Sequence, residues 1–281
     1  MNLLISPIKT QGKKTKILPS ILEEIKKVPF DTYYEPFLGS GEVFFNVNPD
    51  KAVVADNNKL LIHFFLDLQN HVFDHNTART FLEKHGQLLQ EKGQEYYYEM
   101  RSEFNKNADS LYFLFINRSC FNGMIRFNSK GEFNVPFCRK PNRFSKSYIT
   151  KIVNQIERIE KLIWEHGNNW VFLCQSWQQT LADVNGAHPI VYLDPPYVDR
   201  HATYFDDWTD EKNDELFHFL SNCPYSFVLS NWKKNQWRTN DSLNIFNNDQ
   251  RFRTVTREHF YFVGAKLENR NPIEECLITN F

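Results

Sequence analysis

Residues 190–197 read IVYLDPPY. The run of β-branched and aromatic residues predicts a short buried strand that ends at Asp194. The two prolines that follow fix the backbone and remove two N–H donors, so the carbonyl group of Pro195 need not enter a helix. A carboxylate, an outward carbonyl group and the ring of Tyr197 thus follow one strand. Open α/β sheets bind their ligands at this end of their strands.

These three groups suit a reaction at an exocyclic aromatic amine. The nitrogen of such an amine is a poor nucleophile because its lone pair is delocalised into the ring. Two acceptors on its N–H bonds, here Asp194 and the Pro195 carbonyl, favour a tetrahedral nitrogen with a localised lone pair. A stacked ring, here Tyr197, holds the base for in-line attack. The alternative is an ordinary turn, since Asp before Pro often starts one.

Further buried strands on both sides of this segment predict an α/β sheet. The predicted strands are residues 32–37, 52–55, 170–174, 190–194, 225–230, 259–263 and 275–280, the last two as an antiparallel pair. Residues 15–28, 43–47 and 149–164 carry apolar side chains at helical spacing. This order is typical of a Rossmann-like sheet with helices on its faces.

Between residues 61 and 149 the pattern changes. The predicted helices there are residues 60–68, 77–89, 96–104 and 111–118. Residues 125–135, IRFNSKGEFNV, follow as a predicted β-hairpin with a glycine-containing loop. We therefore expect a catalytic domain formed by residues 1–60 and 150–281, and a second, mostly helical domain of residues 61–149 inserted into it.

Residues 35–41, EPFLGSG, predict a ligand-binding turn after the first strand. Gly39 and Gly41 let the backbone pass close to a ligand. Their spacing does not match a phosphate-binding GxxxxGK loop, and no third glycine completes GxGxxG. A nucleoside without phosphates, such as S-adenosylmethionine, fits better. Asp56 ends the next strand, where Rossmann-like folds place an acid on a ribose. The alternative is a structural turn and an exposed carboxylate.

The composition favours a soluble cytosolic protein without a metal. The 281 residues contain 41% hydrophobic residues, but no run of them approaches the roughly 20 that a bilayer span needs, and the N-terminus has no secretory signal. The five cysteines form no CxxC pair, and the nine histidines show no HxxxH or HxH spacing. The net charge is −1, yet residues 9–16 and 126–146 are strongly basic. They predict a nucleic-acid surface or, alternatively, two solvated stretches.

Taken together, these motifs resemble a known family. EPFLGSG, the later Asp56 and DPPY are similar to the cofactor and catalytic motifs of the α group of N6-adenine DNA methyltransferases, the Dam and DpnII type. Residues 115–138, FINRSCFNGMIRFNSKGEFNVPFC, resemble that family's recognition hairpin. With residues 8–16 and 194–201 they look closest to the modification methylases of the EcoRV type. The resemblance covers nearly the whole chain.

The resemblance implies a role for each matching position. The catalytic residues would be Asp194, Pro195 and Tyr197. The residues around S-adenosylmethionine would be Lys14, Glu35, Phe37, Gly39, Ser40, Gly41, Asp56, Gln175, Trp177 and Asp194. Gln175 stands where the family usually has an acid near the cofactor adenine. The residues facing DNA would be Lys9, Phe121, Asn122, Met124, Arg126, Asn134, Pro136, Arg139 and His201.

We therefore expect a methyltransferase that flips an adenine out of double-stranded DNA and methylates its N6 directly from S-adenosylmethionine. The resemblance implies a short palindrome, similar to GATATC or GATC, and the modification half of a restriction-modification system. We expect a monomer, because each strand of a palindrome can be methylated separately. Three alternatives stay open: methylation of RNA adenine or cytosine N4, a catalytically silent DNA-binding protein, and a nucleotide-binding oxidoreductase.

Overall fold

The structure is a computed structural model that describes residues 3–197, 208–234, 239–260 and 272–281. The strands are β1 (Thr32–Glu35), β2 (Ala52–Ala55), β3 (Trp170–Leu173), β4 (Pro189–Leu193), β5 (Ser226–Lys234), β6 (Arg253–Phe260) and β7 (Pro272–Thr279). The α-helices are α1 (Leu18–Ile25), α2 (Glu42–Val47), α3 (Lys59–Gln69), α4 (His75–Lys92), α5 (Gln94–Asn107), α6 (Ser110–Ser119), α7 (Lys146–His166), α8 (Trp177–Ala182), α9 (Asp210–Ser221) and α10 (Asn244–Asn247).

The strands form one seven-stranded sheet in the order β3-β2-β1-β4-β5-β7-β6. The strands from β1 to β5 pair in parallel, and β7 lies antiparallel between β5 and β6. The chain builds outward from β1 to β3 and then returns to place β4 on the other side of β1. This return creates a topological switch point between β1 and β4. The predicted Rossmann-like fold and its closing antiparallel pair are confirmed.

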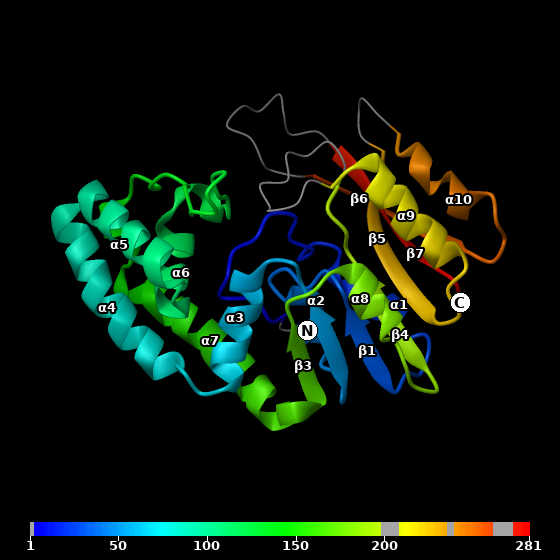
Figure 1. Cartoon of the computed structure of the whole chain (residues 1–281), viewed down its shortest axis with the longest axis horizontal. Coiled ribbons are helices and arrows are strands. Elements are labelled where there is room, and N and C mark those ends of the chain that lie inside the picture. Colours follow the sequence, from blue (N-terminus) through cyan, green and yellow to red (C-terminus); the bar gives the residue numbers. More distant parts are fainter. Residues whose placement is uncertain (1–2, 198–207, 235–238, 261–271) are drawn as a thin grey trace.

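Helices cover the sheet in two separate layers (Figure 1). Tyr33 and Tyr192 pack in a core with α1, α2 and α3, whereas Tyr34 and Val191 pack in a second core with α8, α9 and α10. This alternation follows from the two-residue period of a strand. Strands buried on both faces read as continuous apolar runs, which is why the sequence revealed them.

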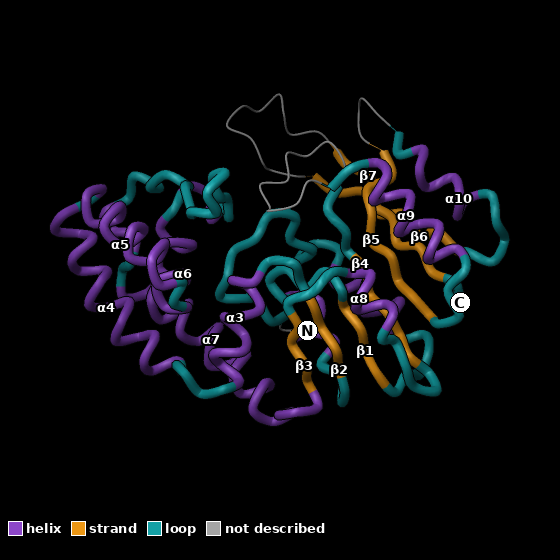
Figure 2. Tube along the Cα trace, viewed as in Figure 1, coloured by secondary structure: helices purple, strands orange, loops and turns teal. Residues whose placement is uncertain are grey.

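The helices α4, α5, α6 and α7 gather at one end of the molecule, away from β4 to β7 (Figure 2). Side chains such as Asp74, Asp109 and Ser145 accept hydrogen bonds from the first turns of three of them and so fix where these helices start. Their core continues without a break into the core under β1 to β3. The division into two domains stays a prediction, and its boundaries would fall inside α3 and α7.

The predicted hairpin folds back through residue pairs and not through continuous strands. Phe127 pairs with Phe133 as an isolated antiparallel bridge, and Cys120 pairs with Phe137. The Tyr97 hydroxyl group of α5 donates a hydrogen bond to the Val135 carbonyl at 2.7 Å. The hairpin is thus attached to the helical end of the molecule. No helix within the described residues is long and apolar enough to cross a membrane.

Candidate active site

The carboxyl ends of four neighbouring parallel strands carry the polar residues that the sequence singled out. Glu35 ends β1, Asp56 follows β2, Gln175 follows β3 and Asp194 follows β4. Because β1 and β4 are neighbours at the switch point, Glu35 and Asp194 lie at the place where open α/β sheets bind ligands, which we call the crevice. The sequence motifs, far apart in the chain, therefore meet at one edge of the sheet.

Asp194 belongs to a cluster of charged side chains from distant parts of the chain. The Nζ atom of Lys14 lies 3.0 Å from Oδ1 of Asp194 and donates a hydrogen bond to the Tyr197 hydroxyl oxygen at 2.5 Å. It also lies 4.8 Å from the centre of the Tyr197 ring. Glu275 of β7 accepts a hydrogen bond from the Tyr197 hydroxyl at 3.0 Å, and its Oε1 atom lies 3.5 Å from Lys14 Nζ.

Burial dominates the electrostatics of Asp194. It raises the pKa of this carboxyl group to about 6, and the negative charge of Glu275 acts in the same direction, whereas Lys14 lowers it. The side chain of Lys14 is 4% exposed and that of Asp194 is 23% exposed. Asp194 is therefore an ionised acceptor at neutral pH that keeps some access to the surface of the crevice.

Pro195 supplies a second acceptor next to this carboxylate. Pro195 is buried, and residues 194–197 have no regular secondary structure after β4. Among the described residues, none donates a hydrogen bond to the Pro195 carbonyl oxygen. Such a carbonyl has two lone pairs to offer to a ligand. The DPPY segment therefore holds the acceptors and the ring that its sequence indicated.

Glu35 is buried beside a tyrosine from its own strand. The hydroxyl group of Tyr33 donates a hydrogen bond to Glu35 Oε2 at 2.6 Å. Burial raises the pKa of Glu35 well above its usual range, and the nearby charges of Asp194 and Asp56 raise it further. Three carboxyl groups thus gather around the crevice, and burial favours the uncharged form of Glu35 among them.

Asp56 ties the EPFLGSG loop to the end of β2. Its Oδ2 atom accepts a hydrogen bond from the backbone N–H of Gly39, and its Oδ1 atom accepts one from Asn58, both at 2.8 Å. Burial raises the pKa of Asp56, and these two backbone hydrogen bonds oppose the rise. Each carboxylate oxygen still has a lone pair available for a further donor.

The two glycines of this loop have left-handed backbones, with φ of 54° at Gly39 and 72° at Gly41. A Cβ atom at Gly41 would lie 2.6 Å from the ring of Phe45, so packing requires glycine there. Among the described residues, nothing lies within 4 Å of a Cβ placed on Gly39. Ser40 between them is buried, and half-buried Phe37 contacts the ring of Trp208. The loop therefore leaves open space at Gly39.

The residues after β3 occupy different environments. The amide of Gln175 donates a hydrogen bond to the Thr180 hydroxyl at 3.1 Å, and the residue is half-buried. Trp177 begins α8 and is buried in the second core, where its ring contacts Phe219. Gln175 thus lies at the carboxyl edge of the sheet, whereas the Trp177 ring packs between helices.

The N-terminal segment also reaches α6 and the residues that lead into the hairpin. The backbone N–H and C=O of Lys9 both bond the side chain of Asn117, at 2.9 Å each. A Cβ atom on Gly123 would collide with the Lys9 side chain, so the two residues lie in contact. Burial lowers the pKa of Lys9 to about 8, and the charges of Arg143 and Arg118 lower it further. Lys9 thus lies near other positively charged side chains.

Arg126 and Asn134 face each other across the hairpin. Asn134 donates its backbone N–H to the Arg126 carbonyl at 3.0 Å. In return, Nε of Arg126 donates to the Asn134 side-chain oxygen at 2.7 Å, and Nη2 donates to the Asn134 carbonyl at 3.2 Å. The guanidinium group is therefore fixed in direction before any ligand binds.

The other hairpin residues predicted to face DNA lie largely at the surface. Phe121 is 50% exposed, and Asn122 beside it is exposed with a left-handed backbone. Pro136 and Arg139 are exposed, and Met124 is half-buried. His201 lies outside the described residues. The hairpin region thus presents an exposed aromatic ring beside polar and basic residues.

The sequence motifs did not reveal Glu275 or Tyr33 as members of the site. Glu275 directly precedes the apolar residues CLI of β7, and an acid next to such a run was the available signal. Lys14 links the two groups of residues, because the same N-terminal segment carries Lys9 to the residues that lead into the hairpin and Lys14 to Asp194.

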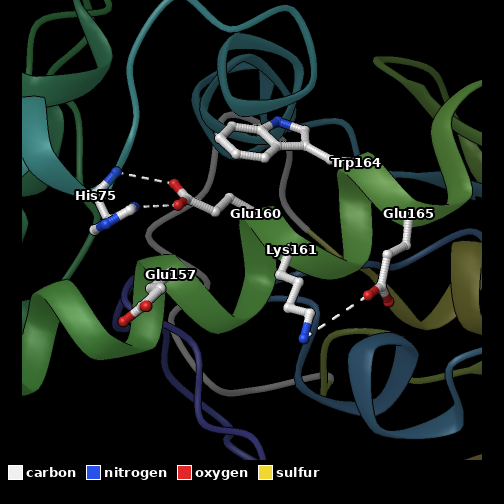
Figure 3. Close-up of a pocket in the computed structure, with 6 residues that line it drawn as sticks. All are labelled: His75, Glu157, Glu160, Lys161, Trp164 and Glu165. Atoms are coloured by element: carbon white, nitrogen blue, oxygen red, sulfur yellow. Dashed lines mark hydrogen bonds and ion pairs between the residues drawn. The ribbon is translucent and has the colours of Figure 1, made fainter.

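A separate surface hollow on α7 is formed by helix packing (Figure 3). Its lining residues are His75, Glu157, Glu160, Lys161, Trp164 and Glu165. Glu160 accepts hydrogen bonds from the backbone N–H and the ring Nδ1 of His75 and so joins α7 to the start of α4. The described residues contain no group of three or more His, Cys, Asp or Glu side chains suited to a metal ion.

Three curated relatives are 31 to 34% identical to this chain over their aligned residues. A DNA adenine methylase of Serratia marcescens is 34% identical over 181 residues, which are 62% of this chain and 60% of the relative. The type II methyltransferase M.MjaIII of Methanocaldococcus jannaschii is 32% identical over 70% of each chain. A DNA adenine methylase of Escherichia coli is 31% identical over 70% of this chain and 66% of its own. This chain thus spans about 60% of the length of the first of these relatives.

Two further comparisons concern the fold and the family. An rRNA methyltransferase of Streptomyces viridochromogenes aligns with 94% of this chain and 84% of its own, with 9% identity and a TM-score of 0.36, a similarity too low to bear on function. The sequence model of the D12 class N6 adenine-specific DNA methyltransferases matches residues 11–261, which include the EPFLGSG loop, the hairpin and DPPY. The chain therefore belongs to the D12 class N6 adenine-specific DNA methyltransferase family.

Proposed function

We propose that the chain transfers a methyl group from S-adenosylmethionine to N6 of an adenine in double-stranded DNA. The observation that carries the proposal is the cluster of Asp194, Tyr197 and Lys14 at the switch point of the sheet. Asp194 and the Pro195 carbonyl accept the two N6–H bonds, and the Tyr197 ring stacks on the base. N6 is paired inside the duplex, so the adenine leaves the stack, at a cost of a few kcal/mol.

The carboxyl edge of the sheet suits the cofactor. Asp56 keeps acceptor capacity for ribose hydroxyl groups, and Gly39 offers open space for a close approach. Glu35, Phe37 and Lys14 surround the same crevice. S-adenosylmethionine, when bound, supplies an electrophilic methyl group on a positively charged sulfonium. The ionised carboxylate of Asp194 complements that charge.

The helical end of the molecule, residues 61–149, would then act as the target-recognition domain. Arg126, held by Asn134, is suited to guanine because its fork meets O6 and N7 together. The exposed ring of Phe121 is suited to fill the gap that a flipped base leaves. Lys9 and Arg139 add positive charge at this surface. We propose a short palindrome as the target, similar to GATATC or GATC, and a monomer as the active form.

The first experiment is long-read sequencing of DNA from cells that lack adenine methylation and express this chain. We expect N6-methyladenine at one short sequence motif, and none in cells that express the Asp194→Ala variant at the same level. Purified Asp194→Ala should still bind S-adenosylmethionine, because the carboxylate acts on the adenine. Absence of methyladenine with folded wild-type protein present would overturn the proposal.

Mass analysis of nucleosides from the same cells separates the alternatives. N4-methylcytosine in DNA, or N6-methyladenine confined to RNA, would show a different substrate for the same site. A protected target motif, tested with restriction enzymes that cut it, would support a role in restriction-modification. Detection in the soluble fraction with the nucleoid would support the cytoplasmic location that we propose.

A further inference from the structure

Glu275 is a buried acid in the middle of a strand. It lies on β7 between β5 and β6, opposite Trp232 and Arg257, and its side chain is 1% exposed. A carboxylate in such a place costs free energy unless charges or hydrogen bonds compensate. Two residues of the crevice, Lys14 and Tyr197, contribute to this compensation.

The hydrogen bonds around the Tyr197 hydroxyl group run in one direction. Lys14 has donors only, so it donates to the tyrosine oxygen at 2.5 Å. The tyrosine hydroxyl then donates its own proton to Glu275 at 3.0 Å. Both the position and the orientation of this hydroxyl are therefore set from its two sides. The ring that the proposed function stacks on adenine is fixed through Glu275.

Lys14 is shared between two carboxylates. Its ammonium group lies 3.0 Å from Asp194 and 3.5 Å from Glu275. In the proposed function the oxygens of Asp194 accept hydrogen bonds from the adenine amino group, which competes with Lys14 for them. A buried ammonium group that loses one counter-ion needs another close by. Glu275 already stands within that distance.

We propose that Glu275 is a positioning residue for methyl transfer, which retains Lys14 and the Tyr197 hydroxyl while Asp194 turns to the adenine. This proposal rests on the proposed function. Glu275 touches neither the base nor the methyl group in this scheme. It acts by keeping the lysine and the tyrosine in place, so that one carboxylate at the crevice is available for the substrate.

The charged groups that face Asp194 make this scheme testable through the pH dependence of activity. They are Lys14 from the N-terminal segment, Glu275 from β7 and Glu35 from β1, with the phenols of Tyr192 and Tyr197 on its own side. Glu275 raises the pKa of Asp194, so loss of its charge lowers that pKa. The acidic limb of the activity profile should then move to lower pH.

The test compares Glu275→Gln with Glu274→Gln in the full chain. Glutamine keeps the size of Glu275 and removes its charge. Glu274 is the preceding acid of the same strand and pairs with Lys234 at 2.8 Å, away from Lys14 and Tyr197, so it is the matched control. The measurements are kcat and KM for a duplex substrate between pH 5 and 8, binding of S-adenosylmethionine by calorimetry, and the melting temperature of each variant.

We expect Glu275→Gln to lower kcat about 10- to 100-fold at pH 7.5, since a lost hydrogen bond to a charged group has roughly that effect. Its acidic limb should move to lower pH, while cofactor affinity stays within about twofold. Glu274→Gln should match the wild type. A merely structural role would lower activity equally at all pH values together with the melting temperature, and this result would overturn the proposal.

Two further outcomes separate this inference from the proposed function. Wild-type activity with an equally active Glu275→Gln variant would overturn the inference and leave the function intact. Wild-type protein without methyltransferase activity would overturn both. If Glu275→Gln does not fold, Tyr197→Phe tests the same network, because it removes the hydroxyl and keeps the ring. We expect it to lose activity about tenfold, and unchanged activity would overturn the inference.

Discussion

Asp194 carries the proposed reaction only in its ionised form, and its surroundings bring the ionisation close to physiological pH. Burial and Glu275 raise its pKa, Lys14 lowers it, and the balance lies at about 6. A protonated Asp194 would offer a hydrogen to the adenine amino group where an acceptor is required. The residue is thus both the acceptor of the reaction and the group that sets its lower pH limit.

We therefore predict that kcat falls as the pH drops through about 6. Below this pKa the carboxyl group is protonated, and each further pH unit removes about nine tenths of the active form. The pH profile of single-turnover methylation checks this, with circular dichroism to show that the protein stays folded. A profile that stays flat down to pH 5 would contradict the raised pKa of Asp194.

The sequence predicted Asp194 but not the charged neighbours that set its pKa. Asp194, Pro195 and Tyr197 stand together in four residues, and their place after an apolar run is visible in the sequence. Lys14 and Glu275 come from the two ends of the chain, and the contact between them depends on the complete sheet. Single residues whose role arises from long-range packing leave only a faint signal in one sequence.

At the scale of elements, the strands with two buried faces were predicted well. β2 coincides with its predicted residues, β3 ends one residue earlier than predicted, and β4 is shifted by one residue at both ends. β6 begins at Arg253, earlier than predicted, because its alternating polar residues do not form an apolar run. The short helices α8 and α10 were missed, since four to six residues are too few to show a helical period.

The EPFLGSG turn provides a test of backbone and packing together. We predict that Gly41→Ala destabilises the protein by about 2 to 4 kcal/mol. Its φ of 72° costs roughly 1 to 2 kcal/mol for a residue with a side chain, and the new Cβ would collide with the Phe45 ring. Unfolding in urea, followed by fluorescence, measures the change.

Gly39→Ala in the same turn is the control for this prediction. Gly39 also has a positive φ, 54°, and among the described residues nothing lies within 4 Å of a Cβ placed there. This variant should therefore lower the free energy of unfolding only by the cost of the backbone strain, about 1 to 2 kcal/mol. Equal losses in the two variants would show that the contact with Phe45 relaxes without cost.

The hairpin depends on α5 for its shape. Asn105 accepts a hydrogen bond from the Phe133 backbone N–H at 2.8 Å and donates one to its carbonyl at 3.2 Å, as a neighbouring strand would. We predict that Asn105→Ala lowers stability by about 1 to 2 kcal/mol and weakens binding of the target duplex. Asn107→Ala, at the exposed end of the same helix, should change neither. Urea unfolding and fluorescence anisotropy measure the two effects, and an unchanged affinity would contradict a role of hairpin rigidity.

For the whole molecule, the net charge of −1 hides an uneven distribution. Four basic side chains lie close together: Lys9, Lys13, Arg118 and Arg143. The arginines lower the pKa of Lys9, and Arg143 also donates a hydrogen bond to Tyr148. Carboxyl groups gather instead at the carboxyl edge of the sheet. In our proposal, the positive charges contact DNA phosphates and the ionised Asp194 faces the positively charged cofactor. The N-terminal segment crosses from one region to the other and would join DNA binding to the site of reaction.

This division of charge predicts two different effects of arginine substitutions in the hairpin region. Arg126 is held in one direction by Asn134, as base reading requires, whereas Arg139 is exposed and contacts phosphates in our proposal. We predict that Arg126→Ala costs about 1 to 3 kcal/mol on the target duplex and little on duplexes with one guanine replaced. Arg139→Ala should weaken all duplexes alike and reduce the slope of log K against log salt by about 1.

Anisotropy titrations of both variants, at several salt concentrations and on the motif found by sequencing, measure these effects. The two variants are controls for each other, because each removes one arginine from the same part of the chain. If Arg126→Ala weakened all duplexes equally and changed the salt slope, Arg126 would be a phosphate contact. The preference for the target duplex over other duplexes would then have to come from other hairpin residues, and Met124 and Pro136 would be the first to test.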